Sequence, residues 1–411
     1  MTLSVRQSRF IKPGVCLLSL LVLSLVHFKL ESSPSMHPYV IPKTNELSMT
    51  VYSNLTEHSR RPQSGFSEYT STKTILMFSA TRWFNEWVGT KWNSTDVFRT
   101  CPVQNCMLTQ DRTLKDSADV VMFRWNDLTK CRKKLKDGQI WILFEHESPV
   151  YSKKSYKRCN DKKINWTCTY RRDSDFTLVH GHFAQKDTEY NISQIHKLWT
   201  SKSKTAIGFI SHCKSPSKRD QFVEKLRSYG VDIDIFGKCG KGRCGSRATN
   251  WLKVWNITKD RRENCFDVLD TRYKFYLSLE NALCKDYVTE KSLHLVLSHQ
   301  IIPLIRDGAN RSIFHPPNSY IDTKDFKSIK AIAEHIKYLS KNFDRYLEYF
   351  HWRNHYSVET ITSVLQSIVC DVCRRVHLGK KYQRLYNNLN DFYTKSHEKK
   401  GDKHICESKL I

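Results

Sequence analysis

A regular alternation of apolar and polar side chains near residue 275 predicts the element around which the chain is organised. Over residues 274–279, one side of an extended chain carries Phe275, Leu277 and Leu279, and the other side carries Tyr276. Large apolar side chains on both faces are typical of a strand in a parallel sheet, because helices cover both faces of such a sheet. We therefore expect a buried parallel β-strand here.

A polar turn, a helix and a second strand are predicted after this strand. Glu280 and Asn281 come at its carboxyl end, and Thr289 can cap a helix over residues 290–298. That helix would lead to the apolar strand at residues 301–305. In such a strand–helix–strand unit, ligands bind just beyond the carboxyl ends of the strands, where backbone N–H groups at the helix start favour phosphate.

Similar patterns elsewhere predict two α/β halves. The first half has short apolar runs that suit buried strands at residues 75–78, 120–123, 140–144 and 176–179. The second half is predicted to contain strands at 206–210 and 231–236 and helices at 218–229 and 328–340. We expect an α/β fold with two Rossmann-like domains facing a cleft, and a hinge near residues 195–204.

The amino-terminal segment predicts attachment to a membrane. Residues 15–26 form a mostly apolar run that follows Arg6, Arg9 and Lys12. The run is short for a spanning helix, so a cleaved signal peptide competes with a retained anchor, which we favour because no small-residue cleavage site follows. The predicted organisation is a cytosolic tail (1–14), a signal anchor (15–29), a Pro- and Ser-rich stem (30–72), a first Rossmann-like domain (73–200), a second Rossmann-like domain (201–375) and a tail (376–411).

Charge narrows the range of partners. The 411 residues include 67 Lys and Arg against 41 Asp and Glu, a formal net charge of +26, which favours anionic partners. Nucleic acid is disfavoured because the charge is dispersed along the chain and no nucleic-acid motif is recognisable. Sugar nucleotides and acidic proteins that carry glycans are anionic as well.

Sequons and cysteines both indicate an oxidising, lumenal compartment. Six Asn-x-Ser/Thr sequons predict glycosylation at Asn54, Asn93, Asn165, Asn191, Asn256 and Asn310. Most of the 14 cysteines follow the apolar run, which predicts disulfides. The candidates are Cys101 and Cys106, close enough to close a small loop, and Cys370 and Cys373 on an apparent helix. Zinc is disfavoured because no second Cys/His pair has suitable spacing, and no metal site is predicted.

Several blocks of this sequence resemble the α-1,3-fucosyltransferases. The segment FYLSLENALCKDYVTEK (275–291) is similar to their GDP-fucose-binding motif. Further similar blocks follow the family's order: SADVVMF, WILFEHESP, RRDSDF, HPPNSYI and CDVC. The resemblance covers roughly residues 73–375 and implies a GT-B-type fold and a Golgi enzyme with a lumenal catalytic part.

The resemblance also implies roles for individual residues. Glu147, in the ESP element, resembles the family's base for the acceptor hydroxyl. Lys291 and Arg219 would offset the charge of the departing diphosphate, although Arg219 on its own is typical of a solvated helix charge. Glu290 would accept hydrogen bonds from sugar hydroxyls. Asn281 would orient the nucleotide, and Tyr287 would pack against the base or sugar.

The sequence differs from the family pattern at His212, Leu279 and Cys284, and in the turn at residues 306–308. Asp232-Ile-Asp234 resembles a metal-binding DxD, but alternation places both carboxylates on the polar face of a strand. We expect no required cofactor, although a divalent cation could stimulate activity.

The implied reaction is inverting transfer of fucose from GDP-fucose to a GlcNAc hydroxyl of an N-glycan or related glycoprotein oligosaccharide, in α-1,3 linkage. The alternatives are a catalytically silent, glycan-binding relative and a basic, glycosaminoglycan-binding secreted protein.

Overall fold

The computed structural model describes residues 71–124, 137–152, 164–186, 189–191, 193–241, 267–382, 384–396 and 403–407. The chain divides into two compact units, Met1–Thr44 and Asn45–Ile411, and all described residues belong to the second unit. The predicted anchor (15–29) and almost all of the predicted stem lie outside the described residues. Within the described part of the chain, no helix has the length and apolar character needed to cross a membrane.

The first half of the chain forms a six-stranded parallel sheet in the order β2-β1-β3-β4-β5-β6. Its strands are β1 (Lys73–Met77), β2 (Cys106–Thr109), β3 (Val120–Phe123), β4 (Ile140–Glu145), β5 (Trp166–Thr169) and β6 (Phe176–Thr177). Their side chains alternate between two cores, so that Ile142 faces one and Leu143 the other. Both faces are buried, as the apolar runs predict.

The second half forms a five-stranded parallel sheet in the order β13-β12-β10-β8-β9. Its strands are β8 (Lys204–Phe209), β9 (Ile233–Phe236), β10 (Tyr273–Leu279), β12 (Ile302–Arg306) and β13 (Ile321–Asp322). Phe275 and Leu277 of β10 face one core, whereas Tyr276 faces the other, as predicted.

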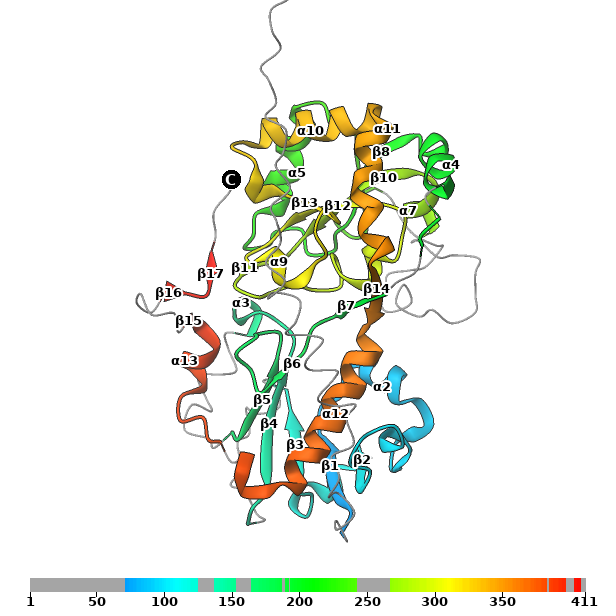
Figure 1. Cartoon of the computed structure of the whole chain (residues 1–411). Coiled ribbons are helices and arrows are strands. Elements are labelled where there is room, and N and C mark those ends of the chain that lie inside the picture. Colours follow the sequence, from blue (N-terminus) through cyan, green and yellow to red (C-terminus); the bar gives the residue numbers. More distant parts are fainter. Residues whose placement is uncertain are drawn as a thin grey trace, which may run out of the picture. The chain divides into compact units, whose positions relative to one another are not determined.

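Helices cover both sheets (Figure 1). The α-helices are α2 (Arg82–Val88), α3 (Pro149–Ser152), α4 (Ser193–Ser201), α5 (Arg219–Ser228), α7 (Asp267–Thr271), α8 (His294–Leu297), α9 (Arg311–Phe314), α10 (Ile329–Lys341), α11 (Phe343–Leu347), α12 (Ile361–His377) and α13 (Leu389–Thr394). Apolar residues of α5 and α10 join one core of the second sheet, while Leu269 of α7 and Val296 of α8 join the other.

Three short ribbons complete the described structure. β7 (Gly181–Gln185) pairs with β14 (Tyr356–Thr360), β11 (Leu283–Cys284) with β17 (Cys406–Glu407), and β15 (Lys395–Ser396) with β16 (Lys403–His404), all antiparallel.

Sequence and structure differ in three places. The helix predicted at residues 290–298 is only α8, His294–Leu297, preceded by turns. Thr289 does not cap it, because its backbone N–H and hydroxyl both donate to the buried carboxylate of Glu280. Strands β2 and β5 were not predicted, because their sequences CMLT and WTCT are only four residues long and contain no long apolar run.

Two disulfides attach helix α12 to the first sheet, although this helix follows the second sheet in the chain. Cys101 pairs with Cys370 and Cys106 with Cys373. The prediction that Cys101 and Cys106 pair to close a small loop is therefore wrong. All four candidate cysteines do form disulfides. Val364, Leu365 and other apolar residues of α12 complete the core on one face of this sheet (Figure 1).

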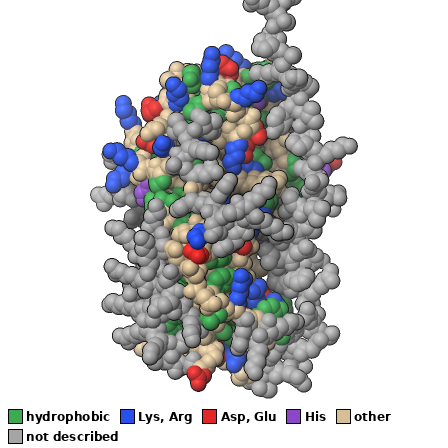
Figure 2. All heavy atoms as spheres, turned by 90° about the vertical axis from the view of Figure 1, so that its left-hand side faces the viewer, with side chains coloured by type: hydrophobic (Ala, Val, Ile, Leu, Met, Phe, Trp, Pro, Cys, Tyr) green, Lys and Arg blue, Asp and Glu red, His purple; other side chains and the backbone are tan. Residues whose placement is uncertain are grey.

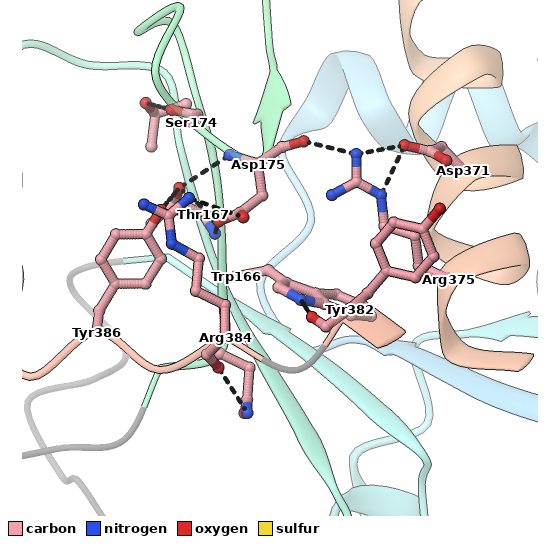
Figure 3. Close-up of polar contacts among 11 residues, drawn as sticks. Trp166, Thr167, Ser174, Asp175, Asp371, Arg375, Tyr382, Arg384 and Tyr386 are labelled. Carbon is pink, nitrogen blue, oxygen red and sulfur yellow. Dashed lines mark hydrogen bonds and ion pairs between the residues drawn. The ribbon is translucent and has the colours of Figure 1, made fainter. Parts of the chain in front are cut away.

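A buried aspartate makes a further connection between distant parts of the chain (Figure 3). Asp175 Oδ2 accepts hydrogen bonds from Thr167 N (2.9 Å) and from the Tyr386 hydroxyl (2.9 Å). The carbonyl of Asp175 accepts a bond from Arg375 of α12, whose Nε also donates to Asp371 (2.9 Å). Hydrogen bonds thus fix the carboxyl-terminal region to β5 and to the loop before β6. The disulfides fix the same region to Cys101 and Cys106.

The adjacent disulfides lead to a testable prediction about stability. Both close nearly the same long loop, with sequence separations of 269 and 267, so either one alone keeps the unfolded chain constrained. Replacing all four cysteines with serine should lower the free energy of unfolding by about 5 kcal/mol, and replacing either pair alone by much less than half of that. Denaturant titration of the three variants measures these losses.

The Cys213–Cys239 disulfide is the control for that cycle, because it closes a separate loop with a sequence separation of 26. Removing this disulfide should lower the free energy of unfolding by about 3 kcal/mol, whichever of the two α12 disulfides is present. Additive losses from the two α12 pairs would contradict the shared-loop argument.

Candidate active site

The turn after strand β4 is built around a buried carboxylate. Glu145 ends β4 and is only 2% exposed. Its Oε1 accepts the backbone N–H groups of His146 (3.0 Å) and Glu147 (3.1 Å), and lies 3.5 Å from Arg124 Nη2. Burial raises the pKa of Glu145, and the Arg124 guanidinium partly offsets this effect. Glu145 therefore shapes the turn, whereas Glu147 projects from it and is half-buried.

A second buried carboxylate organises the turn after strand β10. Glu280 follows β10 and is 1% exposed. Its Oε1 accepts bonds from Thr289 N (2.8 Å) and Thr289 Oγ1 (2.7 Å), and its Oε2 accepts one from Lys291 Nζ (3.0 Å). Lys291 Nζ also lies 3.3 Å from Glu290 Oε1. Burial acts to lower the pKa of Lys291, but Glu280 and Glu290 raise it overall, which keeps the ammonium charged.

Contacts between the two turns bring the predicted residues together. The Tyr287 hydroxyl donates to Glu147 Oε2 (3.3 Å), and its ring meets Tyr170 edge-to-face with centroids 4.9 Å apart. His180, just before β7, has Nδ1 3.8 Å from Glu290 Oε2. The expected base and the segment of residues 287–291 therefore lie in one site, although they follow strands of different sheets.

Arg219 joins this site from the start of helix α5. Its guanidinium is buried, 3% exposed, and donates to the carbonyls of Leu279 (2.9 Å) and His212 (3.0 Å). Burial lowers its pKa, opposed by the nearby Glu280. The interpretation of Arg219 as a solvated helix charge is therefore wrong, whereas neighbouring Lys218 is exposed. Because His212 binds Arg219 through its backbone, the contact does not depend on the side chain at position 212.

Asn281 lies in the turn after β10 and contacts the loop that precedes Arg219. Its carbonyl accepts the backbone N–H of Ser217 (3.2 Å), which attaches the loop before α5 to the end of β10. The side-chain oxygen of Asn281 is buried and has no hydrogen-bond partner among the described residues. It is therefore placed to accept a donor group from a ligand.

The two carboxylates of the DxD-like element lie at the opposite edge of the second sheet. Lys204 Nζ lies 3.6 Å from Asp232 and 3.7 Å from Asp234, and the Tyr273 hydroxyl donates to Asp234 (2.7 Å). Lys204 and Tyr273 begin their strands, so this cluster is at the amino ends, away from Glu280. The two aspartates thus already bind a lysine and a tyrosine.

One group of potential metal ligands occurs among the described residues, namely Cys106, Cys373 and His377. The two cysteines are joined in a disulfide and offer no thiolate, so the group does not have the donors of a zinc site.

The described sequons differ in accessibility. Asn93, Asn191 and Asn310 are exposed. Asn165 is half-buried, and its amide nitrogen, to which a glycan would be attached, donates to the carbonyl of Arg384 (3.3 Å). Asn54 and Asn256 lie outside the described residues.

Comparison with known proteins assigns the family. The chain matches the family descriptions "Fucosyltransferase, N-terminal" over residues 70–181 and "Glycosyltransferase family 10 (fucosyltransferase) C-term" over residues 199–392. It is 32% identical over 324 residues to alpha-(1,3)-fucosyltransferase fut-1 of Caenorhabditis elegans, covering 75% of this chain and 70% of the relative. It is 30% identical to glycoprotein 3-alpha-L-fucosyltransferase A of Drosophila melanogaster, covering 78% of this chain and 60% of the relative.

Among solved structures, a crystal structure of an alpha1,3-fucosyltransferase with GDP is similar over 80% of this chain and 97% of its own, with a TM-score of 0.45 and 14% identity. The family matches and the sequence relatives define the class of protein as a glycosyltransferase. The chain belongs to glycosyltransferase family 10, the fucosyltransferases, and is an enzyme of that class.

Sequence reasoning missed the two carboxylates that shape the site, Glu145 and Glu280. Both directly follow a buried apolar run, and a carboxylate at the end of such a strand is a signal that could have been used. The sequence patterns placed Glu280 only in a polar turn.

The charge arrangement predicts how stability changes in acid. Burial on its own would raise the pKa of Glu290, but the Lys291 ammonium and the His180 imidazole lower it to about 2, from an ordinary value of 4.5. A depressed carboxyl pKa contributes stability above pH 4.5, and this contribution is lost as the pH falls toward 2. The free energy of unfolding of Glu290→Gln should therefore depend less steeply on pH in this window. Urea titrations across the window measure the slope.

The matched control is Glu334→Gln, because Glu334 is exposed on α10 and contacts only the exposed Lys330 across 3.9 Å. It should keep the wild-type slope. A wild-type slope in Glu290→Gln would show that the ion pair with Lys291 does not set the acid sensitivity.

Proposed function

We propose that this enzyme transfers fucose from GDP-fucose to a GlcNAc hydroxyl of a glycoprotein glycan, with inversion at the anomeric carbon and formation of an α-1,3 linkage. The observation that carries the proposal is the hydrogen bond between Tyr287 and Glu147. It brings the Glu147 carboxylate, which follows a strand of the first sheet, to the segment of residues 287–291, which ends at the Lys291 ammonium. Such a transfer needs a base on the acceptor side and positive charge on the donor side.

In the proposed mechanism, Glu147 removes the proton of the acceptor hydroxyl as the oxygen attacks the fucose anomeric carbon. Glu145 holds the backbone of this turn, so the Glu147 carboxylate is oriented before substrate binds. Tyr287 donates a hydrogen bond to the same carboxylate and so helps to hold it in position.

On the donor side, Lys291 and Arg219 would stabilise the charge that develops on the departing GDP. Glu280 and Thr289 fix the position of the Lys291 ammonium. Arg219 lies at the carboxyl ends of β8 and β10, where open α/β sheets bind nucleotides. Glu290 would accept hydrogen bonds from sugar hydroxyls, and Asn281 and Tyr287 would contact the nucleotide and the sugar.

The proposed donor, linkage and acceptor are supported by the family resemblance and by the names of the relatives. The donor follows from the similarity of residues 275–291 to the family's GDP-fucose motif. The α-1,3 linkage and the glycoprotein acceptor follow from the names of the worm and fly relatives. We further propose a GT-B arrangement of two Rossmann-like domains, 73–200 and 201–375, held in the Golgi lumen by the anchor at 15–29 and the stem at 30–72.

The base assignment predicts the behaviour of Glu147→Gln. This variant should transfer fucose at least about a hundredfold more slowly, because a general base contributes factors of about 10² to 10⁴. GDP affinity should stay near the wild-type value, because Gln preserves the contact with Tyr287. Transfer is measured with GDP-fucose and a panel of defined glycans, and GDP affinity by calorimetry.

The control is Glu224→Gln, a change at an exposed carboxylate of α5 that pairs with Arg227. It should transfer at the wild-type rate. Near-normal transfer by Glu147→Gln would remove Glu147 from the base role. Glycan binding by the wild-type chain without any transfer would instead identify a silent relative.

A further inference from the structure

A buried arginine, Arg306, lies at the carboxyl end of β12 in the second sheet. It is opposite Leu279 of β10 in the parallel register, and its backbone carbonyl accepts the N–H of Glu280 (3.1 Å). It is 2% exposed and belongs to the turn where the sequence differs from the family pattern. Because removing a guanidinium from water is unfavourable, the contacts of this side chain indicate what the buried charge does.

The Arg306 guanidinium reaches the loop before helix α5. Its Nη1 donates to the carbonyl of Ser217 (2.6 Å), and its guanidinium carbon lies 5.2 Å from the centre of the Phe222 ring, near the start of α5. Burial lowers the pKa of Arg306 to about 10, so the guanidinium stays charged near neutral pH and the hydrogen bond is charge-assisted. The side chain thus connects the end of one strand to the start of the helix that carries Arg219.

The loop that Arg306 contacts has an unfavourable backbone conformation. Lys218, directly before Arg219, has a φ of +54°, in the left-handed region that residues with a Cβ rarely adopt. Such a conformation persists only where the surrounding contacts fix the chain. Ser217 makes two of these contacts, since its N–H donates to the Asn281 carbonyl (3.2 Å) and its own carbonyl accepts the bond from Arg306. Because that carbonyl belongs to the peptide that joins Ser217 to Lys218, Arg306 binds directly at the left-handed residue.

The orientation of Arg219 depends on this loop. Arg219 is the first residue of α5, and its guanidinium donates to the carbonyls of Leu279 and His212. If the peptide before it rotated, the helix would begin in a different direction and the guanidinium would move. Whatever holds the peptide after Ser217 therefore also holds Arg219.

We propose that Arg306 is a positioning residue of the donor site, which binds the Ser217 carbonyl and thereby orients Arg219 toward the diphosphate of the donor. The proposal rests on the donor side of the proposed function and adds to it a residue that acts only through another. Without Arg306, the turn at Lys218 would relax and Arg219 would bind the diphosphate less well.

The test measures the GDP affinity of the full chain by calorimetry, so it does not depend on catalysis. Arg306→Met should bind GDP about tenfold more weakly than the wild-type chain, as expected when a charge-assisted hydrogen bond is lost. Arg306→Lys should recover part of this affinity, because an ammonium can still donate to the Ser217 carbonyl. Denaturant titration of both variants reports separately on their stability.

A double-mutant cycle distinguishes positioning from independent binding. Arg219→Met should weaken GDP binding by itself, and adding Arg306→Met to this variant should change the affinity by less than about twofold, because the residue that Arg306 orients is already absent. Additive losses in the double variant would show that Arg306 acts independently of Arg219 and would overturn the proposal.

The matched control is Arg353→Met. Arg353 is also a buried arginine of the second half that donates to backbone carbonyls, those of Leu297 (2.7 Å) and His299 (2.6 Å), but these precede β12 and lie near its amino end. Its removal should lower stability and leave GDP affinity unchanged. Wild-type GDP affinity in Arg306→Met, or an equal loss of affinity in Arg353→Met, would contradict the role of Arg306. If the wild-type chain transfers no fucose while Arg306→Met shows the expected loss of GDP affinity, the proposed reaction fails and the role of Arg306 stands.

Discussion

The burial of Glu280 at the end of β10 is the constraint on which the proposed donor side depends. Removing a carboxylate and an ammonium from water costs several kcal/mol for each ion, and this cost is recovered only when geometry and hydrogen bonding are good. Glu280 meets that condition, since Thr289 and Lys291 use both of its oxygens. The segment between Glu280 and Lys291 must therefore fold back over the end of β10. This places Tyr287 beside Glu147 and Glu290 beside His180, two residues of the first half of the chain.

The same arrangement occurs at the end of β4, with backbone donors in place of a lysine. Glu145 binds the N–H groups of the next two residues, so the chain turns sharply and Glu147 faces Tyr287. In each half of the molecule, a structural carboxylate is therefore buried at a strand end and a more exposed one follows it. Glu145 and Glu280 hold the two turns in place, and in the proposed mechanism Glu147 and Glu290 are the carboxylates that act on the substrates.

Charge on the surface is distributed differently from charge in the site. On the face shown in Figure 2, Lys and Arg side chains are spread over the surface with Asp and Glu among them. Among the residues coloured in Figure 2, the basic side chains therefore do not form one continuous patch on that face. Three cations lie at or near the candidate site: Arg219 is buried, and Arg124 and Lys291 are half-buried.

Sequence patterns identified the strands better than the contacts between them. Long apolar runs such as residues 140–144 and 274–279 predicted β4 and β10, because burial on both faces leaves few polar positions. Short strands with mixed composition, such as β5, gave no such signal. The grouping of Glu147 with Lys291 came from the family resemblance, since no local pattern reports a contact across 140 residues such as Tyr287 to Glu147. The cysteine pairing was missed for the same reason.

Cys284 and the turn at residues 306–308, two places where the sequence differs from the family pattern, lie against each other. Cys284, unusual in the donor motif, is bonded to Cys406, so β11 and β17 form a ribbon beside the turn of residues 280–291. Gly308, in the altered turn after β12, leaves room for this ribbon: a Cβ there would lie 2.5 Å from the carbonyl oxygen of Cys284. Only glycine allows so close an approach of two backbones. Cys284 and Gly308 therefore belong to one structural feature, in which a disulfide and a glycine hold the loop that carries Tyr287 and Lys291.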